Sequence, residues 1–306
     1  MICPHCGQEH PDSFQFCPNT GQRMTPQFKA CSNKSCPDYG KYILPLDSRF
    51  CPSCGKPLDS QIVETGNAND ILEFTVEGVS FCMILVEHGR FMMGATEEQE
   101  GPADDEKPAH EVIITRDYYI GETQVTQELW NAIMEDNPSY FEVDDRPVES
   151  VSWIVCQKFI RALNRKLRTT LAGWKFRLPT EAEWEFAARG GNNSLGYQYA
   201  GSDDLCEVAW CSDNSDDETH SVAELEPNEL GIYDMSGNVW EWCQDWYGEY
   251  SCSTQANPTG PSDGNYRVIR GGCWDANAFD GRLSFRDIVI NDKYDNVGFR
   301  LVLSRL

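Results

Sequence analysis

Residues 177–185 of the 306-residue chain read Arg-Leu-Pro-Thr-Glu-Ala-Glu-Trp-Glu and give its clearest local structural signal. Thr180 and Glu183 have the spacing of a capping box, so a helix is predicted to begin after Pro179. The apolar face of this helix and the glycine pair that ends it follow directly: Trp184, Ala187, Ala188 and Gly190-Gly191. The stretch therefore predicts a short helix with defined ends and one buried face.

The surrounding sequence predicts few helices and several short strands. Apolar residues recur at helical spacing after Ser152, which predicts a second helix. These residues are Cys156, Phe159, Ile160, Leu163 and Leu167. A weaker helix is expected over residues 127–134. Strands are expected over residues 74–76, 81–86 and 112–115. Beyond Gly191 turn formers and aromatic residues dominate, which indicates long structured loops. The expected core anchors of these loops are Trp240, Trp242 and Trp246.

Eight motifs follow one another in a fixed order. They are Gly78-Val79-Ser80-Phe81, Phe91-Met92-Met93-Gly94-Ala95, Glu122-Thr123-Gln124-Val125-Thr126, Pro147-Val148-Glu149-Ser150-Val151-Ser152-Trp153, the stretch 177–185, Gly237-Asn238-Val239-Trp240-Glu241-Trp242, Arg267-Val268-Ile269-Arg270-Gly271-Gly272 and Gly298-Phe299-Arg300. In this order they resemble the motifs of the formylglycine-generating-enzyme (sulfatase-modifying-factor) family over residues 74–304. The resemblance implies an α+β domain with a C-type-lectin-like fold, which combines a small antiparallel sheet, two main helices and long loops.

The amino-terminal part of the chain is rich in cysteine. The C-x4-C-x14-C-x2-C spacing of Cys31, Cys36, Cys51 and Cys54 predicts a closed, structural zinc site. The preceding unit has Cys3, Cys6 and Cys17, with Thr20 in place of a fourth cysteine. It either completes a zinc site with His5 or His10 or is a vestigial knuckle. Both units resemble zinc ribbons. The predicted domains are a degenerate ribbon over residues 1–25, a four-cysteine ribbon over 28–58, a linker over 59–73 and the large domain over 74–306.

The positions that carry catalysis in the resembled family are changed in this chain. The family's enzymes use two copper-binding cysteines five residues apart, and the matching positions hold Ala276 and Gly281. Neither residue can supply a thiolate. Cys273 stands close by and is interpreted as a small buried residue. Formylglycine generation is therefore not expected, and no catalytic residue is assigned.

Calcium is the other metal that the resemblance implies. Oxygen ligands from loops suit Ca²⁺, and the family's enzymes bind calcium partly through the segment that matches residues 237–241. The candidate ligands are the side chains of Asn238 and Glu241 and the backbone carbonyls of Gly237 and Val239. The alternative is a loop that hydrogen bonds hold without a metal.

The segment 273–297 resembles the variable region of diversity-generating retroelement proteins, which share this fold and the closing Gly-Phe-Arg. Their diversification mutates adenines in Asn codons, so variable positions cannot hold Lys, Glu, Gln, Met or Trp. In residues 275–281 and 287–295 only Lys293 belongs to these excluded types. The predicted ligand contacts are Asp275, Asn277, Phe279, Asp280, Asp287, Ile288, Val289, Ile290, Asp292 and Tyr294. Ile288-Val289-Ile290 is either part of an exposed apolar patch or a buried strand.

Charge and composition limit the partners. The chain has 25 Lys and Arg against 49 Asp and Glu, a net charge of -24, which opposes binding to nucleic acid. Neither a membrane-spanning apolar stretch nor a secretion signal is recognisable, so a cytoplasmic protein without membrane contact is expected. The preferred function is non-catalytic binding of a protein or other macromolecule, with Phe279 and Tyr294 as anchors. Two alternatives stay open: an enzyme of the formylglycine-generating-enzyme superfamily, of oxidoreductase or non-heme iron type, with unidentified catalytic residues, and a regulatory module that docks through its ribbons.

Overall fold

The computed structural model describes residues 27–30, 42–44, 63–64, 70–171 and 173–305, and the chain divides into two compact units after Asp70. The first unit contains an antiparallel sheet in the order β2-β1-β3. Its strands are β1 (Gln27–Ala30), β2 (Tyr42–Leu44) and β3 (Val63–Glu64). The predicted zinc ligands lie outside the described residues: Cys3, Cys6, Cys17, Cys31, Cys36, Cys51 and Cys54.

Two strands overlap the predicted linker over residues 59–73. β3 lies inside this range and pairs with β1. β4 (Ile71–Val76) begins three residues before the predicted start of the large domain. Ile71 pairs with Ile84 on the neighbouring strand, so the ladder already includes the residues after Asp70. Residues 66–69 include glycine and asparagine, which are typical of linkers, and the start of the domain was therefore predicted at residue 74, after the apolar start of this strand.

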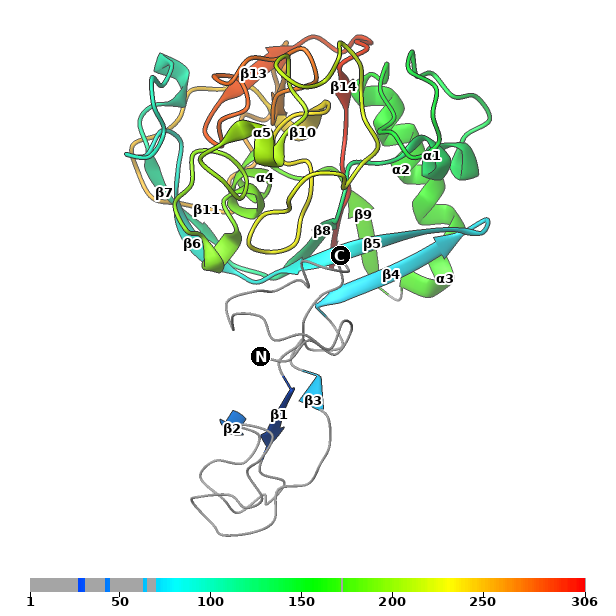
Figure 1. Ribbon diagram of the computed structural model, residues 1–306, viewed down its shortest axis with the longest axis horizontal. Helices are drawn as coiled ribbons and strands as arrows, with labels where there is room; N and C mark the ends of the chain where they lie inside the picture. The colour runs from blue at the N-terminus through cyan, green and yellow to red at the C-terminus, as the bar shows by residue number, and fades with distance from the viewer. Residues whose placement is uncertain (1–26, 31–41, 45–62, 65–69, 172, 306) are drawn as a thin grey trace. The chain divides into compact units, whose positions relative to one another are not determined.

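The second unit is built on a five-stranded antiparallel sheet in the order β4-β5-β8-β15-β9. Besides β4, its strands are β5 (Val79–Val86), β8 (Tyr118–Gly121), β9 (Trp174–Arg177) and β15 (Val302–Arg305). β4 and β5 are the long neighbouring strands in Figure 1. β15 lies between β8 and β9, so the sheet joins segments from both ends of the domain.

Two smaller sheets complete the domain. One has the order β11-β7-β6, with β6 (Gly89–Met93), β7 (His110–Ile114) and β11 (Gln255–Ala256). The other has the order β13-β12-β10-β14, with β10 (Trp240–Trp246), β12 (Arg267–Arg270), β13 (Arg286–Val289) and β14 (Val297–Gly298). The segment 273–297 thus supplies an edge strand, β13, and reaches the opposite edge at β14.

The predicted helices are confirmed. The helical elements are α1 (Gln127–Ile133), α2 (Trp153–Lys166), α3 (Arg168–Leu171), α4 (Glu181–Ala188), α5 (Leu205–Val208), η1 (Asp104–Glu106) and η2 (Gly191–Asn193). At α4 the capping box forms as predicted, because the Thr180 hydroxyl accepts from the Glu183 N–H and the Glu183 carboxylate accepts from the Thr180 N–H. Gly190 ends the helix with a φ of 83°, in the left-handed region that favours glycine.

The apolar stripe of α2 forms part of the main core. Phe159 is fully buried and stacks on Trp130 at 5.1 Å, and Phe299 meets it edge to face at 5.4 Å. Truncating such a ring to alanine costs about 3–5 kcal/mol. Trp240 and Trp242 are buried as predicted. Trp246 is only half-buried, and it stacks on the Arg267 guanidinium at 3.4 Å.

These elements confirm the predicted α+β class, with few helices and small twisted sheets. Among the residues that the structure describes, no helix has both the length and the apolar character needed to cross a membrane.

Candidate functional site

Backbone hydrogen bonds fasten both ends of the segment 273–297 to the domain. Near its start the Trp274 N–H donates to the Asn238 carbonyl at 2.8 Å. Near its end the Ser150 N–H donates to the Tyr294 carbonyl at 2.9 Å. The segment is therefore a loop between two fixed points.

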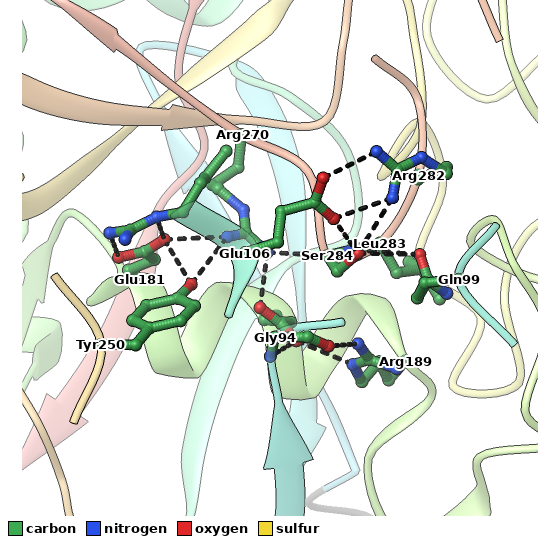
Figure 2. A network of polar contacts seen from close by, with 12 residues as sticks. Gly94, Gln99, Glu106, Glu181, Arg189, Tyr250, Arg270, Arg282, Leu283 and Ser284 are labelled. Carbon is green, nitrogen blue, oxygen red and sulfur yellow. Dashed lines mark hydrogen bonds and ion pairs between the residues drawn. The ribbon is translucent and has the colours of Figure 1, made fainter. Parts of the chain in front are cut away.

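A buried ion pair holds the middle of the segment. Arg282 donates through both Nη atoms to the two carboxylate oxygens of Glu106, at 2.8 and 2.7 Å. Both side chains are buried, and the Ser284 hydroxyl donates to the same carboxylate (Figure 2). Burial by itself raises the pKa of Glu106, but the hydrogen bonds from Arg282 and Ser284 outweigh it and lower that pKa below its usual value. The carboxylate is thus kept ionised.

A second buried cluster anchors β13. Arg286 donates to both oxygens of Glu181, at 2.8 and 2.6 Å. Arg270 bridges the carboxylates of Glu181 and Glu185 at 2.8 and 2.6 Å, and it also donates to the Leu283 carbonyl at 2.7 Å. Figure 2 shows Arg270, Glu181 and Tyr250 gathered in this cluster. Two arginines and two glutamates balance in charge, as buried ions require.

The predicted contact residues lie between these anchors, and most of them reach the surface. Exposed are Asp275, Asn277, Phe279, Asp287, Ile290 and Asp292; half-buried are Asp280, Ile288, Val289 and Tyr294. No predicted contact is fully buried. The structure therefore brings buried frame residues and accessible predicted contacts together in one segment.

Ile288-Val289-Ile290 fits neither of its two predicted descriptions completely. Ile288 and Val289 belong to β13 and pair with Val268 and Arg267, but both are only half-buried because β13 is an edge strand. Ile290 follows the strand and is 49% exposed. The apolar part of the surface is thus smaller than the triplet suggested.

Phe279 is an exposed ring on a rigid support. It is 40% exposed, its face lies 4.1 Å from the Arg282 guanidinium carbon, and it meets Phe285 edge to face at 5.2 Å. Arg282 is itself locked by Glu106. A ring held in this way loses little conformational entropy on binding.

The carboxylates of this surface disfavour each other's ionisation. Burial and the nearby Asp287 raise the pKa of Asp280. Burial and the nearby Asp105 raise the pKa of Asp287. A positively charged partner would relieve this repulsion.

At the position that matches the family's second catalytic cysteine, Gly281 packs closely against a leucine side chain. A Cβ built on Gly281 would lie 2.8 Å from Cδ1 of Leu205 in α5. Ala276 is buried. Cys273 is also buried, which raises the pKa of its thiol well above the usual value, and its Sγ donates to Asp275. This thiol lacks the thiolate character of a reactive cysteine.

Three of the four predicted calcium ligands converge on one point, and a side-chain nitrogen lies there. Nε2 of Gln124 donates to the Val239 carbonyl at 2.9 Å and to Glu241 Oε1 at 3.1 Å, and it lies 3.4 Å from the Gly237 carbonyl. Asn238 does not join them, because its amide exchanges two hydrogen bonds of 3.0 Å with the His220 backbone.

The charge of Glu241 is already balanced. Arg300 donates to both of its oxygens at 2.7 Å, and the Trp184 indole N–H donates to Oε2 at 2.7 Å. With Gln124 at the centre, the donor set as arranged does not fit a calcium ion. One atom stands out: Oε1 of Gln124 is buried without a hydrogen-bond partner. Calcium binding at residues 237–241 stays a prediction.

This fold, with an anchored surface segment, defines a C-type-lectin-like α+β domain. Residues 79–305 match the model of the sulfatase-modifying factor enzyme 1-like domain, and residues 3–55 match that of the double zinc ribbon. The chain therefore belongs to the sulfatase-modifying factor enzyme 1-like family and carries a double zinc ribbon in its amino-terminal part. The predicted resemblance is confirmed.

Individual relatives agree with this assignment. Treponema denticola variable protein 1 matches with a TM-score of 0.68 at 31% identity, over 76% of this chain and 98% of that protein. The chain is 30% identical to the chaperone protein LppX of Paenibacillus barcinonensis, over 68% of this chain and 83% of the relative. It is 28% identical to the formylglycine-generating enzyme of Streptomyces coelicolor, over 69% and 86%. It spans 35% of the length of the serine/threonine-protein kinase pkn1 of Chlamydia pneumoniae, at 32% identity over 67% of this chain.

Some residues that build the site were not predicted from the sequence. The acidic partners Glu106 and Glu181 lie far from Arg282 and Arg286 in the chain, so no local spacing reveals them. One signal was present. Arg282 and Arg286 are arginines within a segment otherwise rich in small, acidic and apolar residues, which indicates buried carboxylate partners elsewhere.

Proposed function

We propose that this protein is a non-catalytic binding protein whose ligand contacts are the accessible residues of the segment 273–297. The observation that carries the proposal is the division of this segment into buried arginines, Arg282 and Arg286, and exposed side chains between and around them. A rigid scaffold that presents chemically varied loop residues is typical of recognition. The 31% identity to a variable protein supports the same interpretation.

The absence of a thiol at Ala276 and Gly281 also favours binding over catalysis. Leu205 fills the space beside Gly281, and the one cysteine of the segment, Cys273, is buried with a raised thiol pKa. Neither position offers the thiolate that copper binding needs.

The proposed ligand is a protein or another macromolecule with basic or amide groups. Phe279 and Ile290 would supply apolar contacts, and Asp280 and Asp287 would receive hydrogen bonds at their rim. An exposed aromatic ring on a rigid support is the usual centre of such an interface. Nucleic acid and membranes are not among the proposed partners.

The diversification part of the proposal is tested in the DNA. Codons 273–297 are compared with flanking genomic sequence for a near-identical repeat that differs only at adenines. A repeat beside a reverse-transcriptase gene is the expected result. If the repeat is absent, the segment is a fixed surface, and the likeness to variable proteins extends to the fold alone.

The binding part is tested with matched surface variants. A protein partner recovered from a cell lysate with the wild-type chain should not bind the double variant Phe279→Ser/Ile290→Ser. It should keep binding to Tyr140→Ser/Leu195→Ser, which removes two other exposed apolar side chains. A partner that responds only to the second pair would place the interface elsewhere and contradict the proposal.

We further propose structural zinc in the ribbon unit, bound by Cys31, Cys36, Cys51 and Cys54, and a cytoplasmic location. Residues 3–55 match the double zinc ribbon, which supports the metal. Elemental analysis should give one zinc per chain if only the four-cysteine site binds, and two if Cys3, Cys6 and Cys17 hold a second ion. Chelation should unfold the ribbon unit. Cell fractionation tests the location.

A further inference from the structure

A second candidate binding site lies outside the predicted contact residues. A cavity of about 300 Å³ opens between the start of α4, the end of β10 and the loops on both sides of β11. Its apolar wall is formed by Met93, Trp246, Tyr250, Pro258 and Pro261. This volume is at the lower end of small-ligand pockets.

Asp245 reaches this cavity with one unpaired oxygen. The side chain is 3% exposed, and its Oδ2 accepts from the Glu181 N–H at 3.0 Å. No donor among the described residues reaches Oδ1. A carboxyl oxygen of a buried side chain without a partner costs free energy unless a ligand or water pairs with it.

His110 offers a second unpaired acceptor. Its Nδ1 lies 3.1 Å from the Pro108 carbonyl, which can only accept, so Nδ1 donates, and in the neutral ring Nε2 then has a free lone pair. Nε2 has no partner in the described part of the chain. The ring is 3% exposed and packs against Tyr250 at 4.9 Å.

The other charged groups of the wall are already paired. Arg286 is bound by both Glu181 oxygens and by the Gly248 carbonyl, and the Tyr250 hydroxyl donates to Glu181 at 2.9 Å. The ionisable groups of the wall that remain unpaired, His110 and the ionised form of Asp245, are therefore acceptors. Glu249, which is exposed and also lines the cavity, adds a further carboxylate.

We propose that this cavity binds an alkyl guanidinium or alkyl ammonium group, with the cation on Asp245 and His110 and the alkyl chain against Trp246, Pro258 and Pro261. Such a group supplies several N–H donors and a positive charge, which match free acceptors in a wall with excess carboxylates. The same chemistry can come from a small cationic molecule or from an arginine or lysine side chain of a partner.

The protonation of Asp245 makes the binding pH-dependent. Burial and the nearby Glu181 raise the pKa of Asp245 to about 8, so a cation must displace a proton at neutral pH. The charged or titratable groups around it are Glu181, Glu183, Arg286, Arg267, His110 and Glu249. Affinity for a permanently charged guanidinium should rise with pH, by up to about tenfold per unit, and level off above pH 8.

The test is calorimetric titration of the full chain with n-butylguanidinium, with N-butylurea as a neutral ligand of the same shape. We expect only the guanidinium to bind, with proton release visible as a dependence of the heat on the buffer. Asp245→Asn, which keeps an acceptor for the Glu181 N–H, should weaken binding by about tenfold or more. Asp263→Asn, at an exposed carboxylate outside the cavity, should not.

Thr259→Trp is the second variant, because it places a large ring at an exposed lining position without touching the buried carboxyls. It should also abolish binding. A short blocked peptide with one arginine distinguishes a partner's side chain from a small molecule. Equal binding of guanidinium and urea, or no binding of guanidinium and peptide, overturns the proposal. Equal losses in Asp245→Asn and Asp263→Asn do so as well.

Discussion

At the level of single residues, Gly281 stands where the resembled family has its second copper-binding cysteine, and it packs against Leu205. A Cβ at position 281 would lie 2.8 Å from a methyl group of Leu205. Leu205 is more than 70 residues away in the chain, so its contact with Gly281 could not be predicted from the sequence. The replacement of the cysteine itself could be.

Gly281→Ala should destabilise the domain by at most about 1 kcal/mol, because the Leu205 methyl group that the new Cβ meets ends a flexible side chain that can shift. The same change in a Leu205→Ala background should cost clearly less, because the methyl group that it meets is gone. Denaturant unfolding of the four proteins in this cycle measures the coupling. Additive effects of the two changes would mean that Leu205 does not limit the space.

Gln124 is the second residue with a specific prediction. Gln124→Leu removes the donor that Val239 and Glu241 accept from, so we expect a loss of about 1–3 kcal/mol of stability. The variant also frees the point where the oxygens converge. If these oxygens can take calcium, millimolar Ca²⁺ should raise the melting temperature of Gln124→Leu more than that of the wild type, with Mg²⁺ as control. Equal shifts would argue against a calcium site.

At the scale of elements, the segment 273–297 is positioned by ion pairs with distant parts of the chain. β13 is a four-residue edge strand, and Arg282 and Arg286 connect it and the loop before it to Glu106 and α4. These pairs are buried, so removing one partner leaves an uncompensated charge.

Glu106→Gln should accordingly cost about 3–5 kcal/mol. The matched control is Glu218→Gln. It breaks the Arg146–Glu218 pair, which is also bidentate but lies at the surface, and should cost about 0–1 kcal/mol. Chemical denaturation measures both. Amide hydrogen exchange should be faster around residue 282 in Glu106→Gln only. Equal losses of stability in the two variants would contradict the view that the buried Arg282–Glu106 pair holds this segment.

Local elements could be predicted from the sequence better than long-range ones. The capping box of α4 and the stripe of α2 depend on residues within one or two turns, and both were correct. The edge position of β13 depends on its pairing with β12 across a loop, so the half-burial of Ile288 could not be predicted. The cavity around Asp245 assembles residues 93–286, which no spacing rule connects.

For the whole molecule, buried carboxyls of two kinds set the dependence of stability on pH. The pKa values of Glu98, Glu106 and Glu181 are lowered despite burial, chiefly by arginine partners and hydrogen bonds. Their contribution is present above pH 4.5 and is lost as the pH falls through the lowered values. Burial raises the pKa of Asp234 to about 6 and that of Asp245 to about 8, so their contribution is lost as the pH rises through these values.

Stability should therefore be highest in mildly acidic solution and decline towards pH 8. Asp245→Asn cannot ionise, so it should lose less stability than the wild type between pH 5 and pH 8. Urea midpoints at several pH values test this expectation. A wild type that gains stability over this interval would show that other groups dominate.

Because Arg282 and Glu106 are buried, the residues that hold the framework are different from the residues that form the surface, and the two sets can evolve separately. Exposed positions such as Ile290 can change with an effect of about 0.5 kcal/mol or less on folding, whereas loss of Arg282 or Arg286 would leave a buried carboxylate without its partner. Descendants of one gene could thus carry many different surfaces on an unaltered framework. Selection among them would act on what each surface recognises, because every one of them would still fold.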